Sequence, residues 1–169
     1  KEVVDMNEIY HRVSIRKYED RPVEEEKILQ ILKAAMQAPS TANQQPWEFY
    51  VVTNKETIIK LSEASGPAKC AAGAPVVVVP AYRTDVRLPA WAQIDLSIAM
   101  ENMWLETDSI GLGGVWLGIA PSEGRMKRIE EIIGMPEGIR AFALFAVGYP
   151  AETKEQQDRF NPERIHYVK

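Results

Sequence analysis

Cysteine and histidine are scarce in this sequence, and their scarcity excludes several kinds of chemistry. The 169 residues include one cysteine, Cys70, and two histidines, His11 and His166. A single cysteine cannot form an intramolecular disulfide, which fits a reducing, cytoplasmic environment. The cysteine and the histidines lie in unrelated contexts, without the ligand spacing of a metal site or the signature of a catalytic nucleophile. If the chain is an enzyme, we therefore expect its reactive group to come from a cofactor.

Long apolar runs and an excess of positive charge are also missing. Because no stretch of about 18 apolar residues occurs, the sequence predicts no membrane-spanning helix. The 20 Lys and Arg residues stand against 24 Asp and Glu residues, and the resulting net charge of −4 argues against nucleic acid as the main partner. The length predicts a single domain, residues 1–169, and we expect a small molecule as its partner.

A dense group of polar side chains lies between Pro39 and Pro46. Pro39 disfavours a helix immediately before it, and Pro46 lacks an N–H, so the segment between them is predicted to be a stiff loop. Such a loop suits the wall of a ligand site. An equally supported alternative is a surface loop whose Ser, Thr and Asn side chains bond their own backbone. A Trp and a strand-like run follow directly.

Arg12, Ser14 and Arg16 lie two residues apart and share one face if this segment is extended. Two guanidinium groups and a hydroxyl on one face form a fork that suits a phosphate. The alternative, favoured when the segment is taken alone, is a solvated basic patch paired with Glu19 and Asp20.

Hydrophobic periodicity predicts alternating helices and strands without a domain linker. Helical spacing indicates helices over residues 6–11, 22–38, 55–64, 90–110 and 121–133. Runs of β-branched and aromatic residues predict strands over 47–53, 75–80 and 139–149. The tail after Pro150 shows no core pattern, so we expect it to pack against a protein surface, and the surface of another chain is one candidate.

The helix expected over residues 90–110 is apolar around most of its circumference, and only its end, residues 106–109, is expected to be exposed to solvent. Such a helix is buried centrally or against another subunit. The stretch from Gly111 to Gly118 follows it. This stretch is neither a dinucleotide fingerprint nor a P-loop, because it follows a helix and lacks Gly-Lys-Ser/Thr. Gly118 has no capping role and is placed to let a backbone N–H approach a ligand.

The order of these motifs resembles that of the FMN-dependent nitroreductase family over essentially the whole chain. The resemblance rests on three motifs, Arg12-x-Ser14-x-Arg16, Pro39-Ser40-x-x-Asn43-x-Gln45-Pro46-Trp47 and Gly111-Leu112-Gly113-x-x-Trp116-x-Gly118. It implies an α+β fold in which helices flank a central mixed β-sheet in three layers, assembled as an intertwined homodimer. It also implies FMN in the subunit interface and a two-electron hydride shuttle from NADH or NADPH to a nitroaromatic, a quinone or a similar small acceptor. The reaction would take place at N5 of FMN, without a catalytic side chain from the protein.

The resemblance also assigns expected roles to individual residues. The motif Arg12-Val13-Ser14 with Arg16 would hold the phosphate and the ribityl chain, and Arg159 from the tail would add to the phosphate site. Pro39, Ser40 and Asn43 would form a wall supplied by the partner subunit, with Asn43 and Gln45 facing the ring edge. Gly118, with Leu117, would place a backbone amide at N5, and Lys69 would lie at the pyrimidine edge.

Two further expectations follow from the resemblance. The tail, about 150–169, would extend over the partner subunit. Many members carry a helical lid that this chain lacks between Tyr82 and Trp91, so its pocket would be open. The alternatives are a protein that binds a flavin or another phosphate ligand without turnover, and a specialised flavin enzyme of the same fold.

Overall fold

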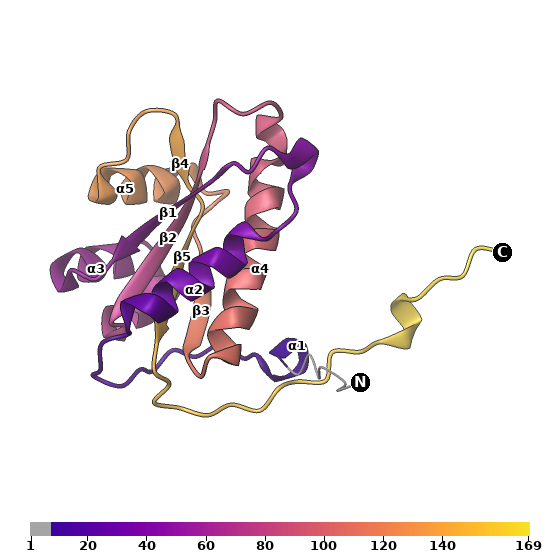
Figure 1. Ribbon diagram of the computed structural model, residues 1–169, viewed down its shortest axis with the longest axis horizontal. Helices are drawn as coiled ribbons and strands as arrows, with labels where there is room; N and C mark the ends of the chain where they lie inside the picture. Colours follow the sequence, from indigo (N-terminus) through magenta and orange to yellow (C-terminus); the bar gives the residue numbers. More distant parts are fainter. Residues whose placement is uncertain (1–7) are drawn as a thin grey trace.

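The computed structural model describes residues 8–169 as an antiparallel sheet with helices on both faces (Figure 1). The helices are α1 (Glu8–His11), α2 (Glu25–Met36), α3 (Lys55–Ser62), α4 (Ala92–Ser109) and α5 (Glu123–Ile133), with short 3-10 helices η1 (Thr41–Asn43), η2 (Gly66–Gly73), η3 (Pro89–Trp91) and η4 (Pro162–Arg164). The strands are β1 (Trp47–Val52), β2 (Val76–Arg83), β3 (Gly113–Gly118), β4 (Ile139–Ala141) and β5 (Ala143–Gly148). The expected first helix began at Met6, and its first two residues lie outside the described range.

The strand order is β1-β2-β5-β3, with β4 also paired to β2. These strands pair antiparallel, and a parallel bridge between Ser14 and Gly114 extends the sheet beyond β3. Helices α2 and α4 pack together, and α4 lies on β2 and β3, whereas α3 and α5 lie together on the other side of the sheet (Figure 1). The predicted α+β class, with a central sheet flanked by helices, is therefore confirmed.

The segment 139–149, predicted as one strand, is two strands with a break at Phe142. Both β4 and β5 pair with β2, but their registers differ by one residue, which is the geometry of a β-bulge. The Phe142 N–H donates to Pro80 O at 2.9 Å, and Pro80 has no N–H with which to continue the ladder. The proline in the middle of β2 therefore accounts for the break.

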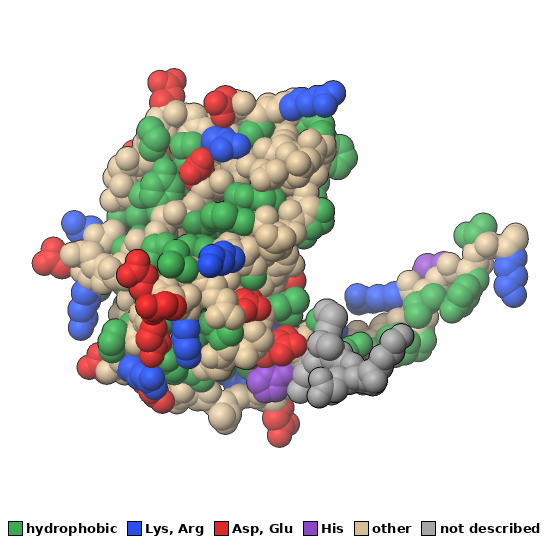
Figure 2. Space-filling view, viewed as in Figure 1, with side chains coloured by type: hydrophobic (Ala, Val, Ile, Leu, Met, Phe, Trp, Pro, Cys, Tyr) green, Lys and Arg blue, Asp and Glu red, His purple; other side chains and the backbone are tan. Residues whose placement is uncertain are grey.

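Helix α4 is apolar on two sides, as its sequence predicted. Its inner face packs Leu96, Met100 and Met103 into the core with no exposed surface. On the outer face Ile94 is 53% exposed and Ile98 is 38% exposed. Figure 2 shows hydrophobic side chains over the face on which α2 and α4 lie. The helix therefore buries one apolar face in the core and presents a second one to the outside.

The prediction that residues 106–109 of this helix are exposed to solvent was wrong at Thr107. This side chain is fully buried, and its Oγ1 donates to Met103 O at 2.8 Å. A threonine can satisfy its hydroxyl within its own helix, so its polarity does not require solvent.

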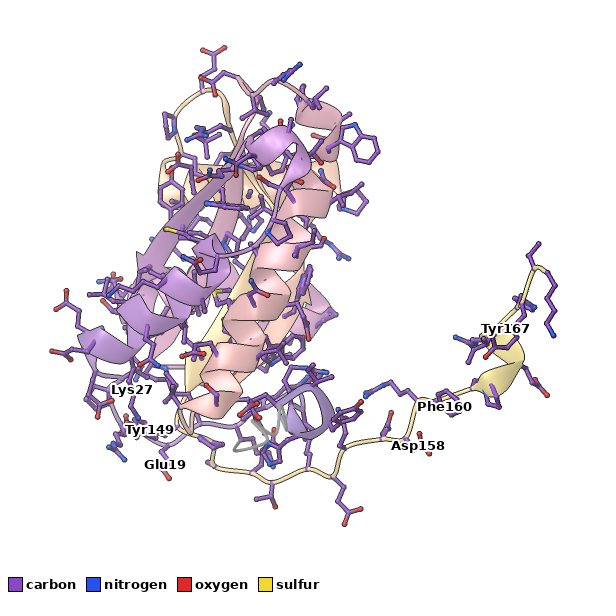
Figure 3. The ribbon with its side chains drawn as sticks, turned by 45° about the vertical axis from the view of Figure 1, so that its right-hand side comes forward. Glu19, Lys27, Tyr149, Asp158, Phe160 and Tyr167 are labelled. Atoms are coloured by element: carbon purple, nitrogen blue, oxygen red, sulfur yellow. The ribbon has the colours of Figure 1, made fainter. Side chains whose placement is uncertain are left out.

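The tail begins after β5 at Tyr149, where a cluster of polar side chains fixes its starting point. The Tyr149 hydroxyl donates to Glu24 Oε2 at 2.7 Å and accepts from Lys27 Nζ at 3.0 Å. The guanidinium of Arg21 lies 3.7 Å from the centre of the Tyr149 ring. Further along, the tail projects away from the body, with Phe160 and Tyr167 on the projecting part (Figure 3).

Among residues 8–169, no helix combines the length and the apolar character that crossing a membrane requires.

Candidate functional site

The segment of Arg12, Ser14 and Arg16 is extended, and it packs Ile15 into the core while its other residues border a cavity. Ser14 bridges Gly114 of β3, and the Ile15 N–H donates to Gly114 O at 3.0 Å. Ile15 is 6% exposed and packs inward. Arg12, Ser14 and Arg16 line one cavity of about 270 Å³, together with Val13. The structure therefore brings the predicted fork together.

The Arg12 side chain is held by α4 and not by the acidic residues that follow it in sequence. Its guanidinium lies 4.0 Å from the Trp104 ring centre, and its Nε lies 3.7 Å from Glu101 Oε1. Trp104 is itself fixed by a hydrogen bond from Nε1 to Gly114 O at 3.1 Å. None of the ion pairs within residues 8–169 joins Arg12 or Arg16 to Glu19 or Asp20. The alternative of a locally paired basic patch is therefore not what the structure shows.

The beginning of the tail runs alongside the fork and adds cations to the same cavity. The Ala151 N–H donates to Lys17 O at 2.9 Å, and the Glu152 carboxylate accepts the Arg16 N–H at 2.7 Å. This hydrogen bond from the backbone lowers the pKa of Glu152. Lys154 Nζ donates to Ser14 O at 3.1 Å and lies 3.2 Å from Glu152 Oε1. Glu152 therefore connects the tail to both Arg16 and Lys154.

Arg159 and Lys154 both line this cavity, and the expected role of Arg159 at the phosphate stays a prediction. Arg159 NH1 donates to Gln156 Oε1 at 3.0 Å. Four cationic side chains, those of Arg12, Arg16, Lys154 and Arg159, thus surround the cavity, with Glu155 as the one acidic residue among those that line it. Sequence reasoning missed Lys154 and Glu152, because a tail without a periodic pattern gives no register against the fork.

The polar loop between Pro39 and Pro46 is strained as well as stiff. Three residues in it have positive φ, Ala42 at 49°, Asn43 at 52° and Gln45 at 45°. Such conformations cost roughly 1–3 kcal/mol each for residues other than glycine, so the surroundings must hold the loop. The Gln45 N–H donates to Ser40 Oγ at 3.0 Å, and Arg83 NH2 donates to Gln45 O at 3.0 Å.

Some side chains of the loop bond the loop itself or helix α4, and others keep hydrogen-bonding groups on exposed residues. Ser40 bonds the loop backbone, as in the alternative interpretation, and Thr41 instead bonds Asp95 of α4. The Gln45 amide Nε2 donates to Asn43 Oδ1 at 3.0 Å. This bond uses the Asn43 acceptor and a Gln45 donor, and the Asn43 Nδ2 donors and the Gln45 Oε1 acceptor remain on exposed residues.

The loop and the fork lie near opposite ends of α4 in one chain (Figure 1). Asp95 holds the loop, and Trp104, nine residues later, supports Arg12. Nine residues of α-helix span about 14 Å. The structure therefore brings Pro39, Ser40, Asn43 and Gln45 together with one another but not with the fork.

Strand β3 leads from the fork towards Gly118. Gly114 lies beside Ser14, and Gly118 is four residues, or about 13 Å, further along the strand. Gly118 is exposed, and a Cβ placed there would meet no atom within 4 Å. Leu117 is 3% exposed, so its side chain belongs to the core and only its backbone is available to a ligand. Packing therefore does not explain the glycine at position 118.

Lys69 is exposed on η2 and is not one of the residues that line the fork cavity. The neighbouring Cys70 is partly buried, and this burial raises the pKa of its thiol. The expected place of Lys69 at the ring edge stays a prediction.

Comparison with known proteins gives consistent results along the chain. The model of the nitroreductase family matches residues 9–68 and 64–149. A protein of Archaeoglobus fulgidus, provisionally named NADH dehydrogenase/NAD(P)H nitroreductase, is 45% identical over 167 residues, 95% of each chain. The solved structure of an FMN-dependent nitroreductase from Clostridium difficile R20291 is 30% identical, with a TM-score of 0.90 over 97% of this chain and 99% of that one.

A third relative, a Clostridium acetobutylicum protein provisionally named NADH oxidase, is similar in both sequence and structure. It is 41% identical, with a TM-score of 0.92 over 96% of this chain and 99% of that one. The match to the family model and these near full-length relatives agree with the fold and with the order of the motifs. This chain belongs to the nitroreductase family.

Proposed function

We propose that this chain binds FMN and acts as an NAD(P)H-dependent oxidoreductase on a small acceptor such as a nitroaromatic or a quinone. The observation that carries the proposal is the convergence of Arg12, Ser14 and Arg16 with Arg159 around one cavity. The family membership and the relative named as an FMN-dependent nitroreductase support the same cofactor.

The residues of the cavity fit the phosphate of FMN. A phosphate carries nearly two negative charges and presents acceptor oxygens, and guanidinium groups bind it through paired donors. Arg12 is orientated by Trp104, and Lys154 is orientated by Glu152, so two of the cations are already fixed in direction. A single phosphate site also favours FMN over a dinucleotide.

The rest of the site suits a ribityl chain and a flat ring. From Ser14, the edge of β3 provides about 13 Å of backbone leading to Gly118, where the open surface lets an N–H approach a ligand. The Asn43 donor and the Gln45 acceptor match the alternating groups at the edge of a pyrimidine ring. When bound, FMN supplies two-electron chemistry at its N5, so the protein needs no nucleophile or metal of its own.

We also infer that each site is built from two chains of a homodimer. Within one chain the loop and the fork lie near opposite ends of α4, and the resemblance to the family assigns the loop that faces a given fork to the second chain. The exposed apolar side of α4, with Ile94 and Ile98, offers a surface for the second chain. The projecting tail, in which Phe160 is 75% exposed, would lie over it. We place this dimer in the cytoplasm, where the Cys70 thiol stays reduced.

Steady-state oxidation of NADH and of NADPH, each with a nitroaromatic and with a quinone, tests the enzymatic part of the proposal. Turnover that depends on the acceptor and on FMN is expected. A protein that binds FMN tightly but shows no turnover with either donor would instead be a flavin-binding protein. This second candidate is favoured by the fork, which explains binding without requiring catalysis.

Mixed dimers test the two-chain site. Arg16→Ala and Asn43→Ala chains, co-expressed with separate tags, should together show higher activity at limiting FMN than either variant homodimer. Recovery is expected because one of the two sites then combines an intact fork with an intact loop. Activity no higher than the mean of the two parent variants would show that fork and loop act within one chain.

A further inference from the structure

Asp95 is a buried carboxylate whose hydrogen bonds all go to the strained polar loop. It lies in the first turn of α4 and is 1% exposed. Its Oδ1 accepts the Thr41 N–H at 2.8 Å and the Thr41 hydroxyl at 3.0 Å, and its Oδ2 accepts Gln44 Nε2 at 2.7 Å. Within residues 8–169, no Lys, Arg or His forms an ion pair with it. A buried carboxylate needs such donors, and here the loop supplies all three.

The two residues that Asp95 holds flank two of the three residues with positive φ in the loop. Thr41 precedes Ala42 and Asn43, which both have positive φ, and Gln44 follows them. A backbone held in this conformation returns to more favourable angles unless its ends are fixed. Asp95 fixes both ends from a rigid helix, and Ser40 and Arg83 fix only the far side at Gln45.

Gln44 extends the same network to the neighbouring surface loop. Its Nε2 donates to Leu88 O at 3.1 Å, and its Oε1 accepts the Leu88 N–H at 2.9 Å. The orientation of the Gln44 amide is therefore determined on one side by Asp95 and on the other by the backbone of Leu88. One carboxylate thereby sets the position of the polar loop relative to the segment that leads into α4.

We propose that Asp95 is a positioning residue for the ligand-facing loop. It touches no ligand, because it is buried beneath the loop, and it acts through Thr41 and Gln44 on Asn43 and Gln45. This inference rests on the proposed function, in which Asn43 and Gln45 face the flavin ring. It makes a distinction that the proposed function does not, because Asp95 governs recognition of the ring and leaves recognition of the phosphate to the fork.

Binding of FMN and of riboflavin to the apoprotein separates these two contributions, because riboflavin has the ring but not the phosphate. Asp95→Asn keeps the size of the side chain and replaces an acceptor with a donor. This substitution should raise the Kd of FMN and the Kd of riboflavin by the same factor, about tenfold, so that the ratio of the two Kd values stays as in the wild type. Arg16→Ala should instead reduce that preference. The visible absorption spectrum of bound flavin should also shift in Asp95→Asn and not in Arg16→Ala.

Thr107→Val is the matched control, because it removes a buried hydroxyl from the same helix, and this hydroxyl bonds Met103 O and not the loop or the fork. It should change both affinities by less than about twofold, because it leaves the hydrogen bonds of the loop in place. If Asp95→Asn does not fold, Thr41→Val tests the same network, since it removes one of the three hydrogen bonds to the carboxylate. Thr41→Val should lower the affinities for FMN and riboflavin by the same factor, and Thr41→Ser should restore both affinities.

Three outcomes would contradict the inference in distinguishable ways. Wild-type affinity for both flavins in Asp95→Asn and Thr41→Val would overturn the role of Asp95 and leave the proposed function standing. A loss confined to FMN would assign Asp95 to the phosphate and also overturn the inference. A wild-type protein that binds neither flavin would overturn the proposed function and the inference together.

Discussion

Replacement of Arg16 by alanine should weaken FMN binding much more than replacement of Lys17, although the two residues are adjacent and carry the same charge. Arg16 lines the fork cavity, and Lys17 does not. The Arg16 N–H that holds Glu152 belongs to the backbone, so Arg16→Ala removes the guanidinium and keeps this link to the tail. The pair of variants thus compares a direct phosphate contact with general electrostatics.

The magnitude follows from the kind of contact. A hydrogen bond to a charged group contributes roughly 1.5–3 kcal/mol, and because Arg16 is exposed we expect the lower end of this range. About 1.4 kcal/mol corresponds to a factor of ten in Kd, so Arg16→Ala should raise the Kd of FMN by about tenfold or more. A charge that acts through water from about 8 Å contributes about 0.5 kcal/mol, so Lys17→Ala should raise it by about twofold.

Titration of the apoproteins with FMN, followed by flavin fluorescence, measures both values. Riboflavin serves as the internal control, because neither substitution should change the affinity for a ligand without a phosphate. As the salt concentration is raised, the small effect of Lys17→Ala on the Kd of FMN should disappear at a lower concentration than the effect of Arg16→Ala. Equal losses in the two variants, or an equal loss for riboflavin in Arg16→Ala, would refute the fork.

Two further predictions concern the stability of the fold around the site. A Cβ at Gly114 would overlap the Phe145 ring, so Gly114→Ala should lower the free energy of unfolding by about 1–3 kcal/mol. Gly118 faces open space, so Gly118→Ala should leave the thermal midpoint nearly unchanged. Equal thermal midpoints in the two variants would show that the packing beneath β3 can relax. His11 Nδ1 lies 2.7 Å from Asp108 Oδ2, and the hydrogen bond to this carboxylate raises the pKa of His11 from 6.5. The pair therefore stabilises the protein fully at a pH below the pKa of His11 in the unfolded chain. This stabilisation is lost as the pH rises through the pKa of His11 in the folded protein. His11→Ala should therefore lower the thermal midpoint more at about pH 5.5 than at about pH 8.5, and a loss independent of pH would contradict the role of the charge.

Local patterns of apolar residues allowed most of the fold to be predicted from the sequence. The strand before Pro80 was recognised from its uninterrupted run of valines, and helix α4 from apolar residues around most of its circumference. The break at Phe142 was missed, because the proline that causes it lies in a different strand, about sixty residues earlier in the sequence. Pairing between distant strands is not encoded in the local pattern of either one.

In the candidate site, too, features set by neighbouring residues were predictable, and features set by residues distant in the sequence were not. The fork was predictable because Arg12, Ser14 and Arg16 are local and share a period of two. Lys154 was not, because its place depends on how the tail pairs with the fork, through Glu152. Asp95 was not predictable either, because sequence alone does not tell which of 24 carboxylates is buried beneath a loop.

The most direct test of the account is the identity of the flavin in the purified protein. The protein should absorb in the visible region, and denaturation should release FMN, one molecule per chain, as measured by chromatography of the supernatant against FMN, FAD and riboflavin standards. Release of FAD would contradict the single-phosphate site. A colourless protein that takes up no FMN on titration would contradict the proposed function as a whole.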